Sequence, residues 1–256
     1  TYTEKGFQGN DKEWESMCIP FDEDAKICLN GVIDRVDLCS LPGEKLIKVI
    51  DYKSSDSQDL SLAKVYYGLQ MQLLTYLEAA KEMVEKEHKG KEAVPAAMLY
   101  YAIKEKNLDW KPESEEEYEK RVLDSMKCKG YVNEEPEIIG HLDKSVVNGG
   151  ELIPGQKSGV VPVAVDKKGL LKKNSGTLST KDFETLIAHT KEKMKECGKG
   201  ILDGKIEAIP YVYEDNEGCT YCPYGSVCGH ESKKDGVREM KKMSDDEVWE
   251  ALYGDD

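Results

Sequence analysis

The sequence predicts an α/β protein with a mixed central sheet flanked by helices, and three observations support this fold class. The 256 residues are 39% hydrophobic and 34% charged, a balance typical of soluble globular proteins that bury a core of their own. Apolar residues recur at every second position in some segments and at every third or fourth position in others. The resulting order is strand, strand, helix, strand, which is typical of a helix packed on a sheet.

The first two strands are predicted over residues 25–38 and 45–53, where apolar residues recur at alternate positions. Gly31 interrupts the first of them and is a candidate bulge. Residues 41–44, Leu-Pro-Gly-Glu, have the composition of a turn. The two strands are therefore expected to form a hairpin.

A helix is predicted over residues 62–88, because its apolar residues recur at intervals of three and four. Gly90 follows as its expected C-cap. Residues 94–103 are dense in Ala, Met, Leu and Tyr and indicate a buried strand. Residues 110–121 are crowded with glutamate and predict a helix with a solvated face.

Further along, residues 160–165 and 170–173 predict a second hairpin around an Asp-Lys-Lys-Gly turn. A long helix is expected over residues 179–201, with Ser179 as its N-cap. Cys197 falls on the apolar face of that helix, which favours a position in the core.

Composition also limits the class of protein. The net charge of −14 and the pI of about 4.9 argue against a broadly basic surface, although they leave room for a local nucleic-acid groove. No run of about 18 apolar residues and no signal peptide is present, so we expect a cytoplasmic protein without a membrane segment. The first residue is Thr1, which indicates a piece of a longer chain.

The eight cysteines are distributed unevenly, because three of them lie between positions 219 and 228. In a chain without a secretion signal this pattern favours reduced thiols and one metal site over a disulfide framework.

Two carboxylates and a lysine are expected to converge in the first hairpin. Asp34 lies in one strand, and Asp51 and Lys53 lie on one face of the next because side chains alternate along a strand. Tyr52 points away and offers its backbone carbonyl. Carboxylate and carbonyl oxygens suit Mg²⁺ or Mn²⁺, and such an ion beside an ammonium group can promote hydrolysis of a phosphodiester.

Three segments carry a resemblance to a known family. They are residues 31–37 (Gly-Val-Ile-Asp-Arg-Val-Asp), 49–53 (Val-Ile-Asp-Tyr-Lys) and 67–76 (Tyr-Gly-Leu-Gln-Met-Gln-Leu-Leu-Thr-Tyr). In order and spacing they resemble the motifs of RecB-like nucleases of the PD-(D/E)XK superfamily. The resemblance implies a restriction-endonuclease-like core over about residues 25–105.

The same resemblance implies roles for individual residues. Asp34, Asp51 and the backbone carbonyl of Tyr52 would bind the metal ion, and Lys53 would orient the attacking water. Gln72 and Tyr76 match the family's Q-x-x-x-Y element and lie on one helix face because they are four residues apart. They would act in the active site or position DNA, although Gln70 competes with Gln72 for this role.

The cysteines Cys219, Cys222 and Cys228 form a C-x2-C-x5-C run that strongly indicates a metal site. Three thiolates need a fourth ligand. His230 would complete a zinc site, and a further cysteine would complete a 4Fe–4S cluster.

The segment 204–211 together with this run resembles the end of AddB, or RexB, subunits of bacterial helicase-nucleases, which hold a 4Fe–4S cluster. The resemblance places the fourth cysteine upstream of this chain, with Cys18 in its Cys-Ile-Pro-Phe context as the alternative. A cluster of this kind is expected to be structural and to be incomplete or absent in this piece.

The resemblance covers nearly the whole chain and implies a single nuclease domain over residues 1–256, with a C-terminal hairpin, helix and cysteine loop over 158–230. It implies a Mg²⁺-dependent exonuclease acting on DNA single strands from unwound duplex ends, with an AddA-type partner subunit, in double-strand break repair by recombination. A catalytically inactive DNA-binding or assembly module, stabilised by Fe–S or zinc, is the alternative.

A mildly basic segment follows the cysteines and predicts either contact with DNA phosphates or a solvated helix face. Its residues are Lys233, Lys234, Arg238, Lys241 and Lys242.

Overall fold

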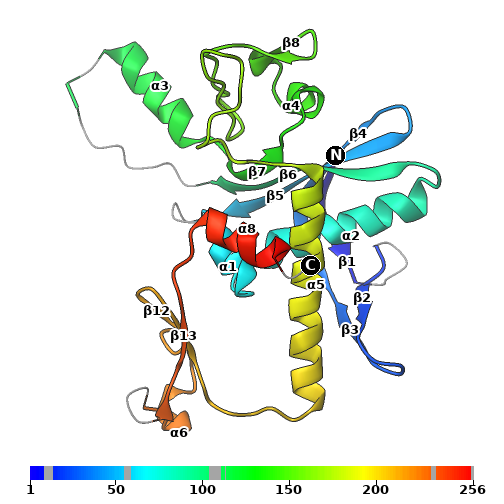
Figure 1. Ribbon diagram of the computed structural model, residues 1–256, viewed down its shortest axis with the longest axis vertical. Coiled ribbons are helices and arrows are strands. Elements are labelled where there is room, and N and C mark those ends of the chain that lie inside the picture. Colours follow the sequence, from blue (N-terminus) through cyan, green and yellow to red (C-terminus); the bar gives the residue numbers. More distant parts are fainter. Residues whose placement is uncertain (9–13, 55–58, 104–110, 113, 232–234, 255–256) are drawn as a thin grey trace.

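The main sheet of the computed structural model has six strands, and helices cover both of its faces (Figure 1). The structure describes residues 1–8, 14–54, 59–103, 111–112, 114–231 and 235–254. The β5–β6 and β7–β10 pairs are parallel and the other pairs are antiparallel, which confirms the predicted α/β class with a mixed sheet. In spatial order the strands are β1 (Tyr2–Phe7), β4 (Gly31–Ser40), β5 (Glu44–Lys53), β6 (Glu92–Ala102), β7 (Lys129–Asn133) and β10 (Thr177–Leu178).

The larger core lies on one face of this sheet, where residues such as Leu77 and Met98 are completely buried. The helices on this face are α1 (Leu62–Tyr66), α2 (Gln72–Glu87), α5 (Thr180–Leu202) and α8 (Asp245–Tyr253). A smaller core on the other face includes Leu99 and Ile139. It is covered by α4 (Pro136–Leu142), the 3-10 turn η1 (Lys144–Val146), β8 (Val147–Asn148) and β9 (Glu151–Leu152).

The predicted helix over residues 62–88 is divided into α1 and α2. Gly68 separates the two with a φ of 76°, a left-handed conformation that ends a right-handed helix. The amide of Leu69 then donates to the carbonyl of Lys64 at 2.7 Å and closes the turn. The end of α2 also differs from the prediction, because its C-cap is His88 and Gly90 lies in the following turn.

The predicted strand over residues 25–38 is likewise divided, at Asn30. Its first part is β3 (Lys26–Leu29), which pairs with β2 (Met17–Pro20) in a separate two-stranded sheet. Its second part is β4. Gly31 begins β4 and forms no bulge; a Cβ atom there would lie 2.8 Å from Cζ of the buried Phe7 side chain. A glycine at this position therefore allows β1 to pack closely.

The expectation of reduced thiols is wrong for Cys18 and Cys28, and the expectation that Cys197 lies in the core is wrong as well. Cys18 and Cys28 face each other across the β2–β3 pair and form a disulfide, so Cys18 is no longer a candidate cluster ligand. Cys197 is exposed on α5, since the face of the helix that packs against the ring of Phe21 is occupied one position later, by the buried Gly198.

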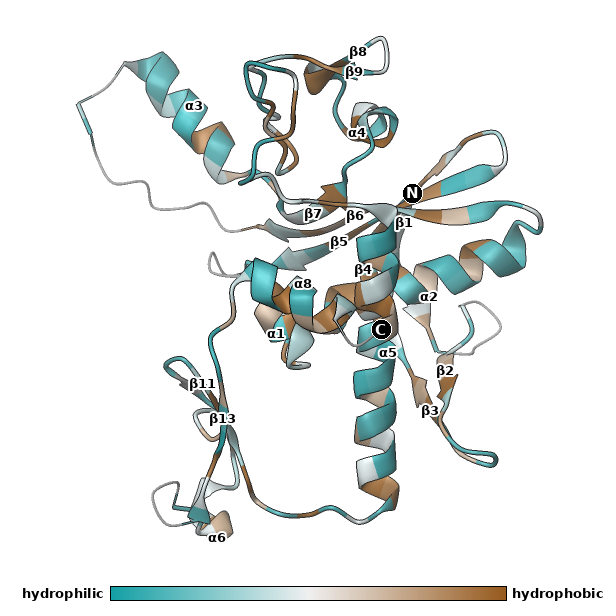
Figure 2. Ribbon diagram, viewed as in Figure 1, coloured by the Kyte–Doolittle hydropathy of each residue, from teal (hydrophilic) through white to brown (hydrophobic). Residues whose placement is uncertain are grey.

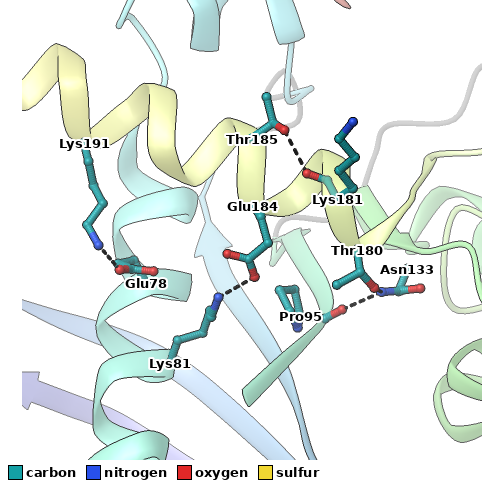
Figure 3. Close-up of polar contacts among 9 residues, drawn as sticks. All are labelled: Glu78, Lys81, Pro95, Asn133, Thr180, Lys181, Glu184, Thr185 and Lys191. Carbon is teal, nitrogen blue, oxygen red and sulfur yellow. Dashed lines mark hydrogen bonds and ion pairs between the residues drawn. The ribbon is translucent and has the colours of Figure 1, made fainter. Parts of the chain in front are cut away.

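The helices α2 and α5 are joined by ion pairs at their interface (Figure 3). Lys81 of α2 pairs with Glu184 of α5, and Lys191 of α5 pairs with Glu78 of α2. The predicted N-cap of α5 is confirmed, because Ser179 accepts a hydrogen bond from the Asp182 amide in a capping box. These contacts fix α2 against the sheet.

The acidic helix α3 (Glu115–Ser125) buries none of its residues, as predicted, and is mostly hydrophilic in Figure 2. Residues 104–110 and 113 lie outside the described part of the chain, so the predicted start of this helix is not described. The second predicted hairpin is present as a turn rather than two strands: Val165 and Leu171 form an isolated bridge, and the Asp166 amide donates to the Leu170 carbonyl.

The hairpin of β4 and β5 also contains a charged cluster. Asp37 pairs with Arg35 at 3.0 Å and with Lys48 at 2.9 Å. Burial raises the pKa of Asp37, but the hydrogen bonds from Arg35 and Lys48 outweigh it and lower the pKa to about 2.

The C-terminal part forms a small cysteine module, residues 211–240, apart from the main sheet at the lower left of Figure 1. Tyr67, between α1 and α2, packs its ring at a tilt of 58° against Tyr213, and its hydroxyl donates to the carbonyl of Lys241 at 3.0 Å. The module contains β11 (Tyr211–Tyr213), β12 (Asn216–Glu217), α6 (Gly225–Cys228) and β13 (Arg238–Met240).

None of the helices in the described residues combines the length and apolar character needed to cross a bilayer.

Candidate active site

The two predicted carboxylates lie at the same end of the β4–β5 hairpin. The antiparallel register pairs Arg35 with Ile50, so the residues just beyond this pair, Asp34 and Asp51, are neighbours across the two strands. The amide of Tyr52 donates to Oδ2 of Asp34 at 2.8 Å and holds that carboxylate beside β5. The alternation of side chains along each strand therefore brings both acids together as the sequence predicted.

Asp51 is the more buried of the two acids, with only 3% of its surface exposed. Burial raises the pKa of Asp51, the Lys53 ammonium lowers it, and the charge of Asp34 raises it again. Oδ2 of Asp51 is shielded from solvent, and its contact with Lys53 is an ion pair rather than a hydrogen bond of good geometry. The two carboxylates thus carry more negative charge than one lysine compensates.

Lys53 is held by three neighbours. Its Nζ pairs with Asp51, donates to Oε1 of Gln72 at 2.8 Å and lies 5.3 Å from the ring centroid of Tyr100. Nε2 of Gln72 in turn donates to the hydroxyl of Tyr76 at 2.9 Å. One chain of polar contacts therefore runs from the carboxylate of β5 to the first turn of α2.

The geometry distinguishes the two glutamines that the sequence left open. The side chain of Gln70 accepts from the Ser61 amide at 2.9 Å and donates to the Asp59 carbonyl at 3.1 Å. It therefore fastens the loop before α1. Gln72, as the first residue of α2, is the glutamine that reaches Lys53.

Tyr100 belongs to the site, but sequence reasoning treated it only as part of a buried strand. The parallel register of β5 and β6 pairs Asp51 with Tyr100. Burial, and after it the charge of Asp51, raises the pKa of the Tyr100 hydroxyl to about 12. Since the pairing links residues far apart in the sequence, no local pattern could have found it.

The residues at this end of the hairpin fit a divalent cation. Asp34, Asp51 and the carbonyl of Tyr52 supply oxygen donors, which Mg²⁺ and Mn²⁺ prefer. A buried carboxylate oxygen without a hydrogen bond, beside a second acid, is a group that a cation would stabilise. Among the described residues no three His, Cys, Asp or Glu side chains gather as a metal site, so two acids and a carbonyl are the donor set here.

The cysteine run forms an exposed loop in the cysteine module. Cys219, Cys222 and Cys228 are all exposed. The three cysteines share one loop, but among the described residues their side chains, with or without His230, are not gathered as a metal site. The side chain of His230 is only 5% exposed, and its Nε2 has no hydrogen-bond partner among the described residues.

Of the basic segment after the cysteines, the structure describes Arg238, Lys241 and Lys242, and these three lie outside any helix. Arg238 lies in β13, where its Nε donates to the carbonyl of Ile209 at 3.0 Å. Lys242 pairs with Glu214 at 2.7 Å. Lys233 and Lys234 lie outside the described residues.

Comparison with known proteins identifies similar chains. The sequence model of the PD-(D/E)XK nuclease superfamily matches residues 3–229. The chain is 36% identical over 236 residues to the B subunit of an ATP-dependent helicase/deoxyribonuclease from Lachnoclostridium phytofermentans, covering 91% of this chain and 20% of the relative.

A protein of the same name from Thermoanaerobacter sp. strain X514 is 33% identical, over 95% of this chain and 20% of its own length. Another, from Clostridioides difficile, is 30% identical, over 96% of this chain and 21% of its own length. The chain therefore spans about a fifth of the length of these curated relatives.

Proposed function

The chain belongs to the PD-(D/E)XK nuclease superfamily, and from this we propose that it is a nuclease domain that hydrolyses DNA phosphodiester bonds with Mg²⁺ or Mn²⁺. The observation that carries the proposal is the convergence of Asp34, Asp51 and Lys53 at one end of the β4–β5 hairpin. The names of the relatives, which describe a deoxyribonuclease, favour DNA as the substrate.

In this proposal each residue has a separate task. Asp34, Asp51 and the carbonyl of Tyr52 hold the cation. When bound, the ion supplies Lewis-acid polarisation of a phosphoryl oxygen and activation of a water molecule. The ammonium of Lys53 orients the attacking water and stabilises negative charge that develops on the phosphate.

Two further residues position Lys53 and the substrate. Gln72 holds the Lys53 ammonium through Oε1, which restricts its orientation. The hydroxyl of Tyr76 accepts from Gln72, so its own proton remains free to donate to a phosphate oxygen. Tyr100 lies against the same ammonium and limits its access to water.

The wider role follows from the relatives. Because they are named as subunits of a helicase and deoxyribonuclease, we infer that the domain receives single strands from an unwound duplex end. An AddA-type partner subunit and a role in recombinational repair of double-strand breaks belong to the same proposal, as does the assignment of residues 1–256 to one domain of a longer chain.

The test is cleavage of end-labelled single-stranded DNA with Mg²⁺ or Mn²⁺. Asp51→Asn and Lys53→Ala are each expected to lower the rate by about a hundredfold or more. Asp203→Asn and Lys205→Ala, which change the same charges at exposed positions, serve as matched controls. Retention of cleavage in both active-site variants would refute the assignment of these residues.

An inactive native chain would favour the alternative, a binding and assembly module. Calorimetric titration with Mn²⁺ separates the two functions, because a working site binds the ion and loses it in Asp51→Asn. Absence of both cleavage and Mn²⁺ binding would leave the module as the better account.

For the cysteine module we propose a structural metal held by Cys219, Cys222 and Cys228. A 4Fe–4S cluster needs a fourth cysteine, and Cys18 is already bound to Cys28 in a disulfide. The buried side chain of His230, whose Nε2 has no hydrogen-bond partner in the described part of the chain, supports the zinc alternative within the chain itself. Elemental analysis distinguishes them: iron with sulfide supports the cluster, and zinc that is lost in His230→Ala supports the Cys₃His site.

A further inference from the structure

A pocket of about 480 Å³ lies at the edge of the main sheet, beside the proposed active site. β10 pairs only with Val132 and Asn133 of β7. The first residues of β7, from Lys129 onward, therefore line the pocket as a sheet edge. The volume is within the range of pockets that hold small molecules or single building blocks of a polymer.

The strand register connects the pocket to the carboxylates. Asp51 of β5 pairs with Tyr100 of β6, and Tyr100 pairs with Lys129 of β7. Residues that pair across neighbouring strands have side chains on the same face, and each strand lies about 4.8 Å from the next. Lys129 is therefore about 10 Å from Asp51 along the same face, a distance that two or three stacked nucleotides span at about 3.4 Å each.

Four lysines line this pocket: Lys127, Lys129, Lys157 and Lys173. The pocket also has carboxylates, so its charge is not purely positive. Lys129 pairs with Asp59 at 2.7 Å, and Lys157 pairs with Asp124 at 3.0 Å in an exposed contact that is weak in water. The side chain of Lys173 is 94% exposed, and its Nζ lies 3.8 Å from Oδ2 of Asp246, which is also exposed.

Lys127 differs from the other three lysines. Its Nζ donates to the backbone carbonyl of Ser158 at 2.8 Å, an uncharged acceptor. Burial, and then the charge of Lys157, lower the pKa of Lys127, while Asp124 and Asp143 act more weakly in the opposite direction. An anion bound between Lys127 and Lys157 would compensate both the loss of hydration at Lys127 and the repulsion between the two ammonium groups.

The wall of the pocket is rigid where it meets β7. A Cβ atom at Gly176 would lie 2.3 Å from the carbonyl oxygen of Gly130, so the loop before β10 packs directly on the β7 backbone. The amide of Val132 donates to the Gly176 carbonyl at 2.9 Å and fastens the loop there. The lysines therefore surround a cavity that exists before any ligand binds.

From these observations we propose that the pocket binds the phosphate backbone of the DNA strand next to the bond that is cut, with Lys127, Lys157 and Lys173 each contacting a phosphate. This inference rests on the proposed function in taking DNA as the substrate. It adds a path for the DNA strand along the edge of the sheet, which runs from the carboxylates past Lys129 into the pocket.

The test measures binding and cleavage separately. Binding of a fluorescent single-stranded oligonucleotide is followed by anisotropy without divalent metal, over a range of salt concentrations. The double variant Lys127→Gln, Lys157→Gln is compared with the control Lys168→Gln, Lys205→Gln, which removes the same charge at exposed positions. Lys173→Gln is added as a single variant, because its exposed side chain can be replaced without disturbing the fold.

Each lost phosphate contact lowers the slope of log K against log salt by about 0.7 for a single strand. The double variant should therefore lose about 1.4 in slope and bind on the order of tenfold more weakly at about 0.1 M salt. Lys173→Gln should lose about half of that slope. In cleavage assays KM should rise while kcat at saturating DNA stays within about twofold.

The outcomes separate this inference from the proposed function. Cleavage by the native chain together with unchanged binding in the pocket variants would overturn the pocket and leave the nuclease intact. Binding that weakens in the pocket variants of a chain that does not cleave would support the pocket and refute the nuclease activity. A native chain that binds no oligonucleotide would overturn both. Circular dichroism tests whether the double variant is folded. If it is unfolded, the salt dependence of binding by Lys173→Gln decides the question, and a slope equal to that of the native chain refutes the proposed path of the strand.

Discussion

Asn133 offers the sharpest test of how the site is supported, because its side chain joins three elements in the interior. It is completely buried at the end of β7. Its Nδ2 donates to the carbonyl of Pro95 at 3.0 Å and to Oγ1 of Thr180 at 2.8 Å (Figure 3). Its Oδ1 accepts from the Glu135 amide at 3.0 Å. The β5–β6 register shifts near Pro95, so this carbonyl lies where the pairing is irregular.

The substitution Asn133→Ala should be strongly destabilising. It removes one buried and two partly buried hydrogen bonds, each worth about 1 kcal/mol net, and leaves the groups that they joined without a hydrogen-bond partner. We therefore expect the free energy of unfolding to fall by about 3–5 kcal/mol. For a chain of this length that corresponds to a decrease in melting temperature on the order of 10 °C.

Urea unfolding followed by circular dichroism measures this change directly. Asn148→Ala, at an exposed position in β8, is the matched control and should change stability by less than about 0.5 kcal/mol. A loss below about 1 kcal/mol in Asn133→Ala would refute the reasoning, because it would mean that water or a rearranged neighbour satisfies the same groups.

Three further predictions concern stability. Because the pKa of Asp37 is lowered from 3.8 to about 2, the ionised carboxylate stabilises the fold fully above pH 3.8, and this stabilisation is lost as the pH falls toward about 2. Asp37→Asn should therefore lower the free energy of unfolding by about 2 kcal/mol at neutral pH and by progressively less below about pH 4. Urea unfolding at each pH measures this difference. Gly31→Ala should cost about 1–3 kcal/mol because its Cβ overlaps a buried ring, whereas Gly159→Ala meets nothing within 4 Å and should be neutral in thermal melts. Reduction of the Cys18–Cys28 disulfide, which closes a separation of 10 residues, should lower stability by about 2–3 kcal/mol, and an equal melting temperature with and without reductant would contradict that pairing.

Much of the candidate site could be predicted because its spacing is local. Asp51 and Lys53 share a face since side chains alternate along any strand, and Gln72 meets Tyr76 since residues four apart are neighbours on any helix. The hairpin that brings Asp34 to them follows from a turn of four residues. The start of α5 was equally predictable, because a capping box involves only residues three apart.

The rest depended on contacts between distant segments. The helical period continued through residues 62–88, yet the left-handed backbone at Gly68 ended α1, and the loop contacts of Gln70 left Gln72 as the partner of Lys53. The exposure of Cys197 depended on how α5 rotates against the sheet, which the helix's own period does not specify.

The sequence by itself indicated which residues are candidates for the chemistry and which short elements present them, because strand and helix periods act over a few residues. Only the tertiary structure decided which elements became neighbours. Strand register placed Tyr100 beside Asp51 and Lys129 beside Tyr100, and the pairing of β2 with β3 joined Cys18 to Cys28. Register is set by the packing of whole sheet faces, so it cannot be obtained from the residues that it brings together.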